Sequence, residues 1–254
     1  MLLVADVGNT NTKIGVYDGA RLLASWRIIS RREQTADEYG LFLKTLLGTR
    51  GIPASRIEAV AIANVVPPVQ QTLEWMCEQY FGVTPFTVEG PRQSAIVVNV
   101  DYPEEVGADR IVTAVAASAI YRPPVIVVDL GTATKFNCVN AAGEFIGGAI
   151  APGIRTSADA LLSRAARLFN VELVRPKEAI GRNTATNIQS GFVYGFVALV
   201  DGMVERIRAE MGDSPTVVAT GGLAPLIRDA ARTIQHINGE LALEGLRLVY
   251  ERSR

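Results

Sequence analysis

The chain has 254 residues, 48% hydrophobic and 20% charged, a composition typical of one large or two small well-packed globular domains. Its formal net charge of −1 gives no basic footprint, so nucleic acid is not expected as a partner. No apolar run is long enough to span a membrane, the first residues lack a signal-peptide pattern, and Cys77 and Cys138 are isolated; we therefore expect a reduced, cytoplasmic protein.

The single histidine, His236, lies near the C-terminus among polar residues. A single histidine excludes a histidine-based metal cluster and argues against a Ser-His-Asp catalytic triad. Any acid–base chemistry is therefore expected from carboxylates.

The chain opens with an apolar run at residues 2–5 and an alternating run at 13–17, which predict two strands joined by a polar turn. The turn does not match the P-loop pattern, which also needs a helix after it. Its backbone N–H groups could still bind phosphate oxygens, with Asp6 holding a magnesium ion against them. Taken alone, however, the stretch is better explained as an ordinary hairpin rich in turn-forming residues.

A second copy of this pattern favours the phosphate-binding interpretation over the ordinary hairpin. Residues 127–137 read VVDLGTATKFN, again an apolar run followed by D-x-G and threonines. Asp129 matches Asp6 and Gly131 matches Gly8, an offset of 129 − 6 = 123 residues, about half of the chain. The repeat predicts an α/β fold with two duplicated domains that close on a shared cleft.

The remaining pattern predicts the other elements in order. Strands are expected at residues 21–28, 57–63, 85–88, 125–129, 135–140, 145–150 and 216–219. Helices are expected at residues 36–47, 68–81, 103–119, 156–169, 186–211 and 224–232, with a capping box at Thr35–Glu38, Asp101 capping the third and Thr156 or Ser157 capping the fourth. Two prolines at residues 121–124 mark a boundary between domains at 1–120 and 121–254.

The segment PEEVGADR is the first candidate for a catalytic base. On a continuous helix Glu105 and Asp109 would share one face, and such like-charge pairing can raise a carboxylate pKa toward that of a useful base. A solvated helix face, with Arg110 balancing Asp109, explains the same spacing equally well.

Three glycine-containing stretches allow the backbone to approach another group closely. Residues 147–154 could lie against a ligand or a neighbouring strand, and residues 220–222 could lie under an adenine or form a simple turn. Gly191 and Gly195, four apart on the longest predicted helix, favour core or dimer packing over a ligand site.

With these motifs in place, the chain resembles a type III pantothenate kinase. The motifs DVGNTNTK, EVGADRIV, VDLGTAT, GGAIAPGI, IGRNT, QSG, ATGGLA and LEGLRLVYE follow one another in the family's order. The resemblance implies two actin-like (ribonuclease H-like) domains, each a mixed sheet flanked by helices, with the active site in the cleft between them. It also implies transfer of phosphate from ATP to the hydroxyl of pantothenate, the first step toward coenzyme A.

The resemblance further implies a homodimer that needs Mg²⁺ and a monovalent cation, potassium or ammonium. It implies that Asp109 is the catalytic base, that Asp6 organises Mg²⁺ and that Asp129 binds the monovalent cation. The implied ATP-binding residues are Asp6, Val7, Gly8, Asn9, Thr10, Asn11, Thr12, Lys13 and Thr132. The implied substrate-binding residues are Tyr102, Gly107, Ala108, Asp109, Arg110 and Thr184, the last reaching across the dimer.

Three positions depart from the family pattern. The family continues GTATT with an acidic residue two positions later, whereas this chain has Lys135 and Asn137 there. We expect the Lys135 ammonium either to replace the monovalent ion in part or to weaken ATP binding. The substrate tyrosine usually lies a few residues before the proline of the EVGADR motif, whereas Tyr102 immediately precedes Pro103.

Two alternatives remain open. The chain could be a kinase of the same superfamily that acts on a sugar or another small alcohol, although its cysteine and histidine count does not suit the zinc-binding sugar kinases. It could also be a catalytically altered member that acts as a regulator. The retention of Asp6 and Asp109 favours the enzyme.

Overall fold

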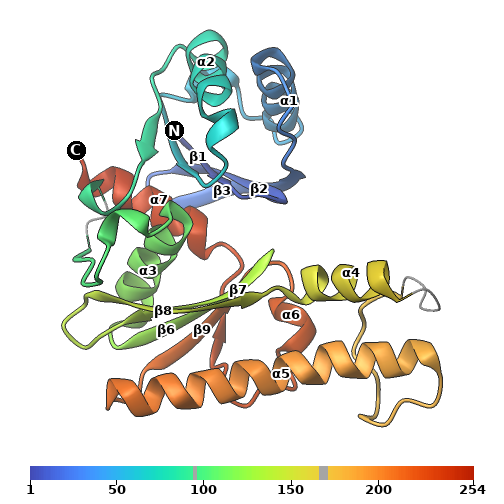
Figure 1. The fold of residues 1–254 in the computed structure, drawn as a ribbon. Helices are drawn as coiled ribbons and strands as arrows, with labels where there is room; N and C mark the ends of the chain where they lie inside the picture. The colour runs from blue at the N-terminus through green and yellow to red at the C-terminus, as the bar shows by residue number, and fades with distance from the viewer. Residues whose placement is uncertain (94–95, 166–170) are drawn as a thin grey trace. The chain divides into compact units, whose positions relative to one another are not determined.

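The computed structural model describes residues 1–93, 96–165 and 171–254, which divide into two compact units (Figure 1). Unit 1 contains Met1–Ala116 and Leu241–Arg254, and unit 2 contains Ala117–Glu240. This division differs from the predicted domains at 1–120 and 121–254. The last helix packs on the strands of unit 1, so tertiary contacts place it with the first half of the chain.

The first sheet has mixed strand directions. It contains β1 (Leu2–Val7), β2 (Asn11–Asp18), β3 (Arg21–Ile29), β4 (Ala59–Asn64) and β5 (Phe86–Val88), in the order β3-β2-β1-β4-β5. The first three strands form an antiparallel meander, whereas β4 pairs in parallel with β1, and β5 pairs in parallel with β4.

The second sheet repeats this topology. It contains β6 (Val125–Leu130), β7 (Ala133–Val139), β8 (Phe145–Pro152), β9 (Thr216–Thr220) and β10 (His236–Ile237), in the order β10-β9-β6-β7-β8. Again three strands form an antiparallel meander and two add in parallel. The predicted duplication of two α/β domains is therefore confirmed, and every predicted strand is present within a few residues.

Helices cover both sheets (Figure 1). They are α1 (Ala36–Gly48), α2 (Gln70–Phe81), α3 (Ala108–Tyr121), α4 (Ile154–Arg164), α5 (Thr184–Met211), α6 (Ala224–Ile227) and α7 (Leu241–Arg252), with short 3-10 turns η1 (Ala54–Arg56), η2 (Pro67–Val69), η3 (Pro91–Gln93) and η4 (Pro103–Glu105). The capping box of α1 is confirmed, because Thr35 Oγ1 accepts from the Glu38 N–H and the Glu38 carboxylate accepts from the Thr35 N–H.

Alternation along the strands decides which sheet face each helix covers. In unit 1, Leu3, Ala5 and Val7 of β1 point into a core formed with α1 and α2. In unit 2, Ile126, Val128 and Leu130 of β6 point into a core formed with α5. Asp6 and Asp129 occupy the alternate positions, so each lies on the opposite face of its sheet.

Three helix predictions were wrong in detail, and one helix was missed. The predicted helix at 103–119 begins at Ala108, because Val106 is extended and separates α3 from η4; Asp101 therefore does not cap it. The cap of α4 is Gly153 rather than Thr156 or Ser157, and the predicted end of that helix lies outside the described residues. Helix α6 is shorter than predicted and α7 was not predicted at all.

The unpredicted helix α7 is held by a close backbone contact within unit 1. A Cβ atom at Gly245 would overlap the carbonyl group of Val112 in α3, so only glycine allows the two helices to approach this closely. A Cβ atom at Gly15 of β2 would lie only 2.9 Å from the Leu243 side chain of α7. Helix α7 therefore closes the face of the first sheet that α1 and α2 leave uncovered.

Candidate active site

The first candidate loop is a tight turn between β1 and β2. The Gly8 N–H donates to the Asn11 carbonyl at 3.1 Å, which closes the turn, and a Cβ atom at Gly8 would lie 3.0 Å from that oxygen. Asn9 and Thr10 at its tip are exposed, whereas Thr12 is buried. The loop therefore presents small polar residues at the end of a rigid hairpin, as phosphate binding requires.

Ser30 fastens this loop to the end of β3. Its hydroxyl donates to the Gly8 carbonyl at 2.6 Å and lies 2.9 Å from Thr12 Oγ1. Its backbone N–H donates to the Thr10 carbonyl at 3.0 Å. No sequence motif marks Ser30, and only the pairing of β2 with β3 brings it to the loop.

A lysine faces the strand-end aspartate in each sheet. Asp6 is in register with Lys13 across the β1–β2 pair, and Asp129 is in register with Lys135 across the β6–β7 pair. Directly opposed residues of an antiparallel pair project to the same face. Each aspartate therefore shares one sheet face with one lysine, on the side away from the core formed with α1 and α2 or with α5.

The candidate base, Asp109, lies in the first turn of α3. The Arg110 N–H donates to Asp109 Oδ1 at 2.8 Å, and a Cβ atom at Gly107 would lie 2.8 Å from the same oxygen. The glycine therefore leaves room for the carboxylate to fold back against the helix start, where the backbone N–H groups favour its negative charge.

The expected pairing of Glu105 with Asp109 was wrong. Glu105 belongs to η4 and Asp109 to α3, and the extended backbone of Val106 breaks the helical spacing between them. The structure gives Asp109 its position through Gly107 and Arg110 instead.

Val65 brings the Asp109 segment close to the first loop within unit 1. Its N–H donates to the Val7 carbonyl at 3.0 Å, directly after β1, and its Cγ1 would lie 3.7 Å from a Cβ atom at Gly107. Because β1 and β4 are parallel, their carboxyl ends meet at one edge of the sheet. Asp6 and the Gly107–Asp109 segment therefore lie at the same edge.

The second candidate loop, between β6 and β7, is held from its own unit. The Thr132 carbonyl accepts from the Gly153 N–H at 3.1 Å and from Thr156 Oγ1 at 2.7 Å. A Cβ atom at Gly153 would overlap the backbone of Gly131 and Thr132. The glycine-rich segment before α4 therefore supports this loop through close backbone packing.

The other small-residue stretches also serve close packing. Gly148 faces the Phe136 carbonyl of β7 at a φ of +144°, and Gly221 faces the backbone of Leu130 at a φ of +90°. Both are conformations that residues with side chains rarely adopt. Close packing against a neighbouring strand explains the contacts of residues 147–154, and a simple turn explains those of residues 220–222.

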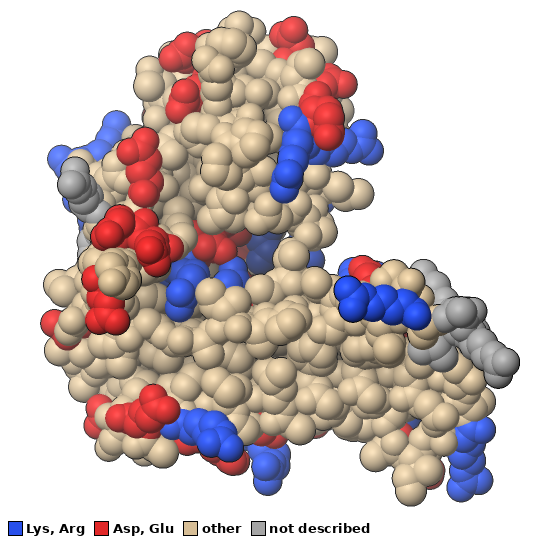
Figure 2. Space-filling model, viewed as in Figure 1, with Lys and Arg blue, Asp and Glu red and all other residues tan. Residues whose placement is uncertain are grey.

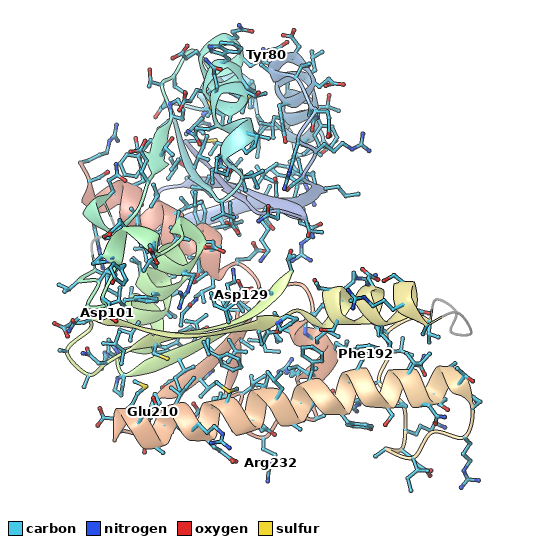
Figure 3. All side chains as sticks on the ribbon, viewed as in Figure 1. Tyr80, Asp101, Asp129, Phe192, Glu210 and Arg232 are labelled. Atoms are coloured by element: carbon cyan, nitrogen blue, oxygen red, sulfur yellow. The ribbon has the colours of Figure 1, made fainter. Side chains whose placement is uncertain are left out.

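The register of β6 with β7 produces an ion pair between Asp129 and Lys135. Lys135 Nζ lies 2.8 Å from Asp129 Oδ2, and both side chains are largely buried, at 15% and 17% exposed. Figure 3 shows Asp129 on the side of its sheet away from α5. The distance is that of a charge-assisted hydrogen bond, so the ammonium is in direct contact with the carboxylate.

Tyr102 and Thr184 lie in separate units. Tyr102 is 63% exposed and precedes η4 in unit 1. Thr184 is the first residue of α5 in unit 2, where the Asn183 side chain caps the helix by accepting from the Thr186 N–H at 2.9 Å. The substrate roles of both residues stay predictions.

Among the described residues, no group of three or more acidic, histidine or cysteine side chains is arranged to hold a metal ion. In the same part of the chain, no helix is long and apolar enough to cross a membrane. On the face drawn in Figure 2, basic side chains lie in small groups beside acidic ones.

Comparison with known proteins identifies the family. The type III pantothenate kinase family matches residues 2–206. Type III pantothenate kinases from Syntrophotalea carbinolica and Anaeromyxobacter sp. strain K are each 49% identical to the chain over 254 residues, covering 100% of both sequences.

Solved structures share the fold at low sequence identity. A ROK hexokinase from Thermus thermophilus matches with a TM-score of 0.51 and 15% identity, covering 100% of this chain and 99% of that one. The activator of 2-hydroxyisocaproyl-CoA dehydratase from Clostridium difficile, with bound ADPNP, matches with a TM-score of 0.55 and 14% identity, covering 99% and 96%. Together with the duplicated mixed sheets, these matches identify the actin-like fold of the sugar kinases. The chain belongs to the type III pantothenate kinase family.

Proposed function

We propose that this protein is an ATP-dependent pantothenate kinase that forms 4'-phosphopantothenate, the first step of coenzyme A biosynthesis. The observation that carries the proposal is the 49% identity to type III pantothenate kinases over the full length of both chains. The retention of Asp6 and Asp109 at one edge of the first sheet supports it, because both carboxylates that the chemistry needs are present.

In the proposed reaction the hydroxyl oxygen of pantothenate attacks the γ-phosphorus of ATP. The bond from that phosphorus to the β–γ bridging oxygen breaks in line, and ADP leaves. Asp109 accepts the proton of the hydroxyl, and Gly107, Ala108 and Arg110, with Tyr102 and Thr184, bind the substrate. Such a transfer depends on positioning and charge neutralisation, so a site without histidine is sufficient.

The residues from Asp6 to Lys13, with Thr132, are proposed to bind ATP. Asp6 is half-buried directly before a turn of exposed polar residues, and one carboxylate beside phosphate oxygens is a donor set that Mg²⁺ prefers. Bound there, Mg²⁺ would neutralise the charge of the transferred phosphate. Ser30, Gly8 and Thr12 keep the loop in one conformation through their hydrogen bonds.

We also infer that the protein works as a homodimer in the cytoplasm. Both cysteines, Cys77 and Cys138, are buried and free of disulfides, which suits a reducing compartment. Gly191 and Gly195 of α5 have no atom within 4 Å of a Cβ position, so that face is open to a second chain.

The test is a coupled ADP-release assay with pantothenate, ATP and Mg²⁺. We expect ADP release that depends on pantothenate, and formation of phosphopantothenate by mass spectrometry. Release with a sugar or another small alcohol, but none with pantothenate, would favour the superfamily alternative. A folded protein that binds ATP without releasing ADP from any substrate would favour the regulator.

A further inference from the structure

The environment of Asp129 does not suit a monovalent cation. An ion such as potassium must exchange its hydration shell for several protein oxygens. Asp129 Oδ2 is already in contact with Lys135 Nζ at 2.8 Å, a distance that leaves no space for an ion between the two atoms. A cation approaching the other carboxylate oxygen would meet the positive charge of the ammonium at close range.

The strand pairing makes this contact a fixed part of the fold. Asp129 and Lys135 are in register on the central strands β6 and β7, and each has a strand on its other side as well. The side chains are 17% and 15% exposed, respectively. Screening by water and salt is therefore weaker than for a surface ion pair.

A second difference at the same face points in the same direction. Asn137, two residues after Lys135, lies on the same face of β7 and is fully buried. The resemblance to the family implies an acidic residue at this position and threonine at 135. The two replacements together remove one negative charge and add one positive charge, which is the change expected if a cation were supplied by the chain.

The register of this pair, an aspartate opposite a lysine, recurs in the first sheet. There Lys13 is the register partner of Asp6, as Lys135 is of Asp129. The turn between the paired residues is one residue shorter in the second sheet, because 13 − 6 = 7 and 135 − 129 = 6. Each phosphate-loop candidate therefore carries an aspartate and a lysine on one sheet face.

We propose that the Lys135 ammonium takes the place of the monovalent cation at Asp129, so that this protein needs neither potassium nor ammonium. The inference rests on the proposed pantothenate kinase activity for its kinetic consequence. Its structural consequence, that Asp129 does not bind a monovalent cation, is independent of which substrate is phosphorylated.

The test compares the wild-type protein with Lys135→Thr in potassium, ammonium, sodium and choline chloride at one ionic strength. Two quantities are measured in each salt: the rate of pantothenate-dependent ADP release and the midpoint of thermal unfolding. Lys177→Thr is the matched control, because it removes an exposed lysine from the same unit.

For the wild type and for Lys177→Thr we expect rates within twofold of each other in all four salts, and equal unfolding midpoints in potassium and choline. For Lys135→Thr we expect a rate at least tenfold lower in choline that potassium restores, and a midpoint that potassium raises. Adding Asn137→Asp to Lys135→Thr should strengthen both potassium responses. Lys135→Arg, which keeps the charge, should stay independent of potassium.

A wild-type rate that rises tenfold or more with potassium, or a wild-type midpoint that potassium raises selectively over choline, would overturn the inference. Both measurements use the wild-type protein, so the inference can be contradicted even if Lys135→Thr does not fold. If the wild type releases no ADP with pantothenate in any salt, the proposed function fails. The unfolding comparison then still decides whether Lys135 excludes the cation.

Discussion

At the scale of single residues, the contacts of Asp109 suit it to the role of general base. Its carboxylate accepts from the Arg110 N–H and folds over Gly107, at the start of a helix whose dipole favours negative charge. These contacts orient one oxygen and leave the carboxylate half-buried. An oriented carboxylate is what a general base needs, and no histidine is required for that role.

Asp109→Asn should therefore lower the turnover number by about 100-fold or more, because the amide cannot accept the proton of the hydroxyl. Thermal unfolding and the affinity for ATP should change little, since asparagine keeps the size and the acceptor oxygen. Asp213→Asn, an exposed loop position of the same chemistry, is the control. Near-normal turnover in Asp109→Asn would mean that another group is the base.

A second aspartate, Asp201 of α5, acts on stability. It is 4% exposed, and its carboxylate accepts from the Thr233 N–H, the Thr233 hydroxyl and the Arg232 N–H. Burial alone would raise its pKa, but these hydrogen bonds from Thr233 and Arg232 outweigh it, so that the pKa of Asp201 is lowered.

A pKa that is lower in the folded than in the unfolded protein adds stability above the unfolded value of about 3.9, and this is lost as the pH falls through the folded value. Asp201→Asn should therefore be less stable than the wild type at pH 7, and the difference should shrink below about pH 4. Urea unfolding at several pH values measures it. A difference that stays constant down to pH 3 would contradict the linkage.

At the scale of elements, the hairpin β1–β2 owes its shape to its neighbour β3. Ser30 makes three contacts to the loop, two through its hydroxyl and one through its backbone N–H. Removing the hydroxyl leaves the backbone contact in place but loosens Gly8 and Thr12. Each lost hydrogen bond is worth about 1 kcal/mol.

Ser30→Ala should therefore raise the KM for ATP by roughly three- to tenfold, with a smaller effect on the KM for pantothenate. Ser30→Thr, which keeps the hydroxyl, should recover most of the ATP affinity. Steady-state kinetics with each substrate varied in turn separates the two constants. Equal changes in both constants would indicate general destabilisation rather than positioning of the loop.

Helix α1 shows how much a terminal motif contributes. The reciprocal bonds between Thr35 and Glu38 satisfy N–H groups that would otherwise lack partners in the first turn. Thr35→Ala should cost about 1 kcal/mol and lower the unfolding midpoint by about 2–4 °C. Thr35→Ser should restore the unfolding midpoint. Scanning calorimetry of the three proteins measures this, and equal midpoints would show that the cap contributes no stability.

At the scale of the whole molecule, the return of the C-terminal helix to unit 1 binds distant parts of the chain together. Gly245 permits contact with the backbone of α3 at Val112. Gly245→Ala should destabilise the protein by about 1–3 kcal/mol, because a methyl group must push the helices apart. Gly48→Ala, at an open position in α1, should be neutral or slightly stabilising in the same denaturant titration.

The open face of α5 bears on the proposed dimer. Within the chain, a Cβ atom at Gly195 would have no atom within 4 Å, and leucine there would improve helix propensity. Gly195→Leu should therefore fold normally but shift the protein from dimer to monomer, as measured by light scattering after size exclusion. A dimer of unchanged stability would show that the interface lies on another face of the protein.

Much of the fold could be predicted from the sequence, because its signals are local. Apolar runs and their alternation predict the strands, and the Thr35–Glu38 pattern predicts the start of α1. The repeat of D-x-G after an apolar strand, at Asp6 and Asp129, predicts the duplicated architecture that the two sheets confirm. Family motifs carry the proposed site residues for the same reason, since each is a short contiguous string.

Only the tertiary structure decided the contacts between residues that the sequence separates. It placed Leu241–Arg254 with unit 1, and it brought Ser30 to the first loop, because strand pairing and helix packing fix these positions. It also separated Glu105 from Asp109, since one extended residue breaks helical spacing. The pairing of Lys135 with Asp129 belongs to both levels: the sequence determines that a lysine is there, and the register of β6 with β7 decides what it contacts.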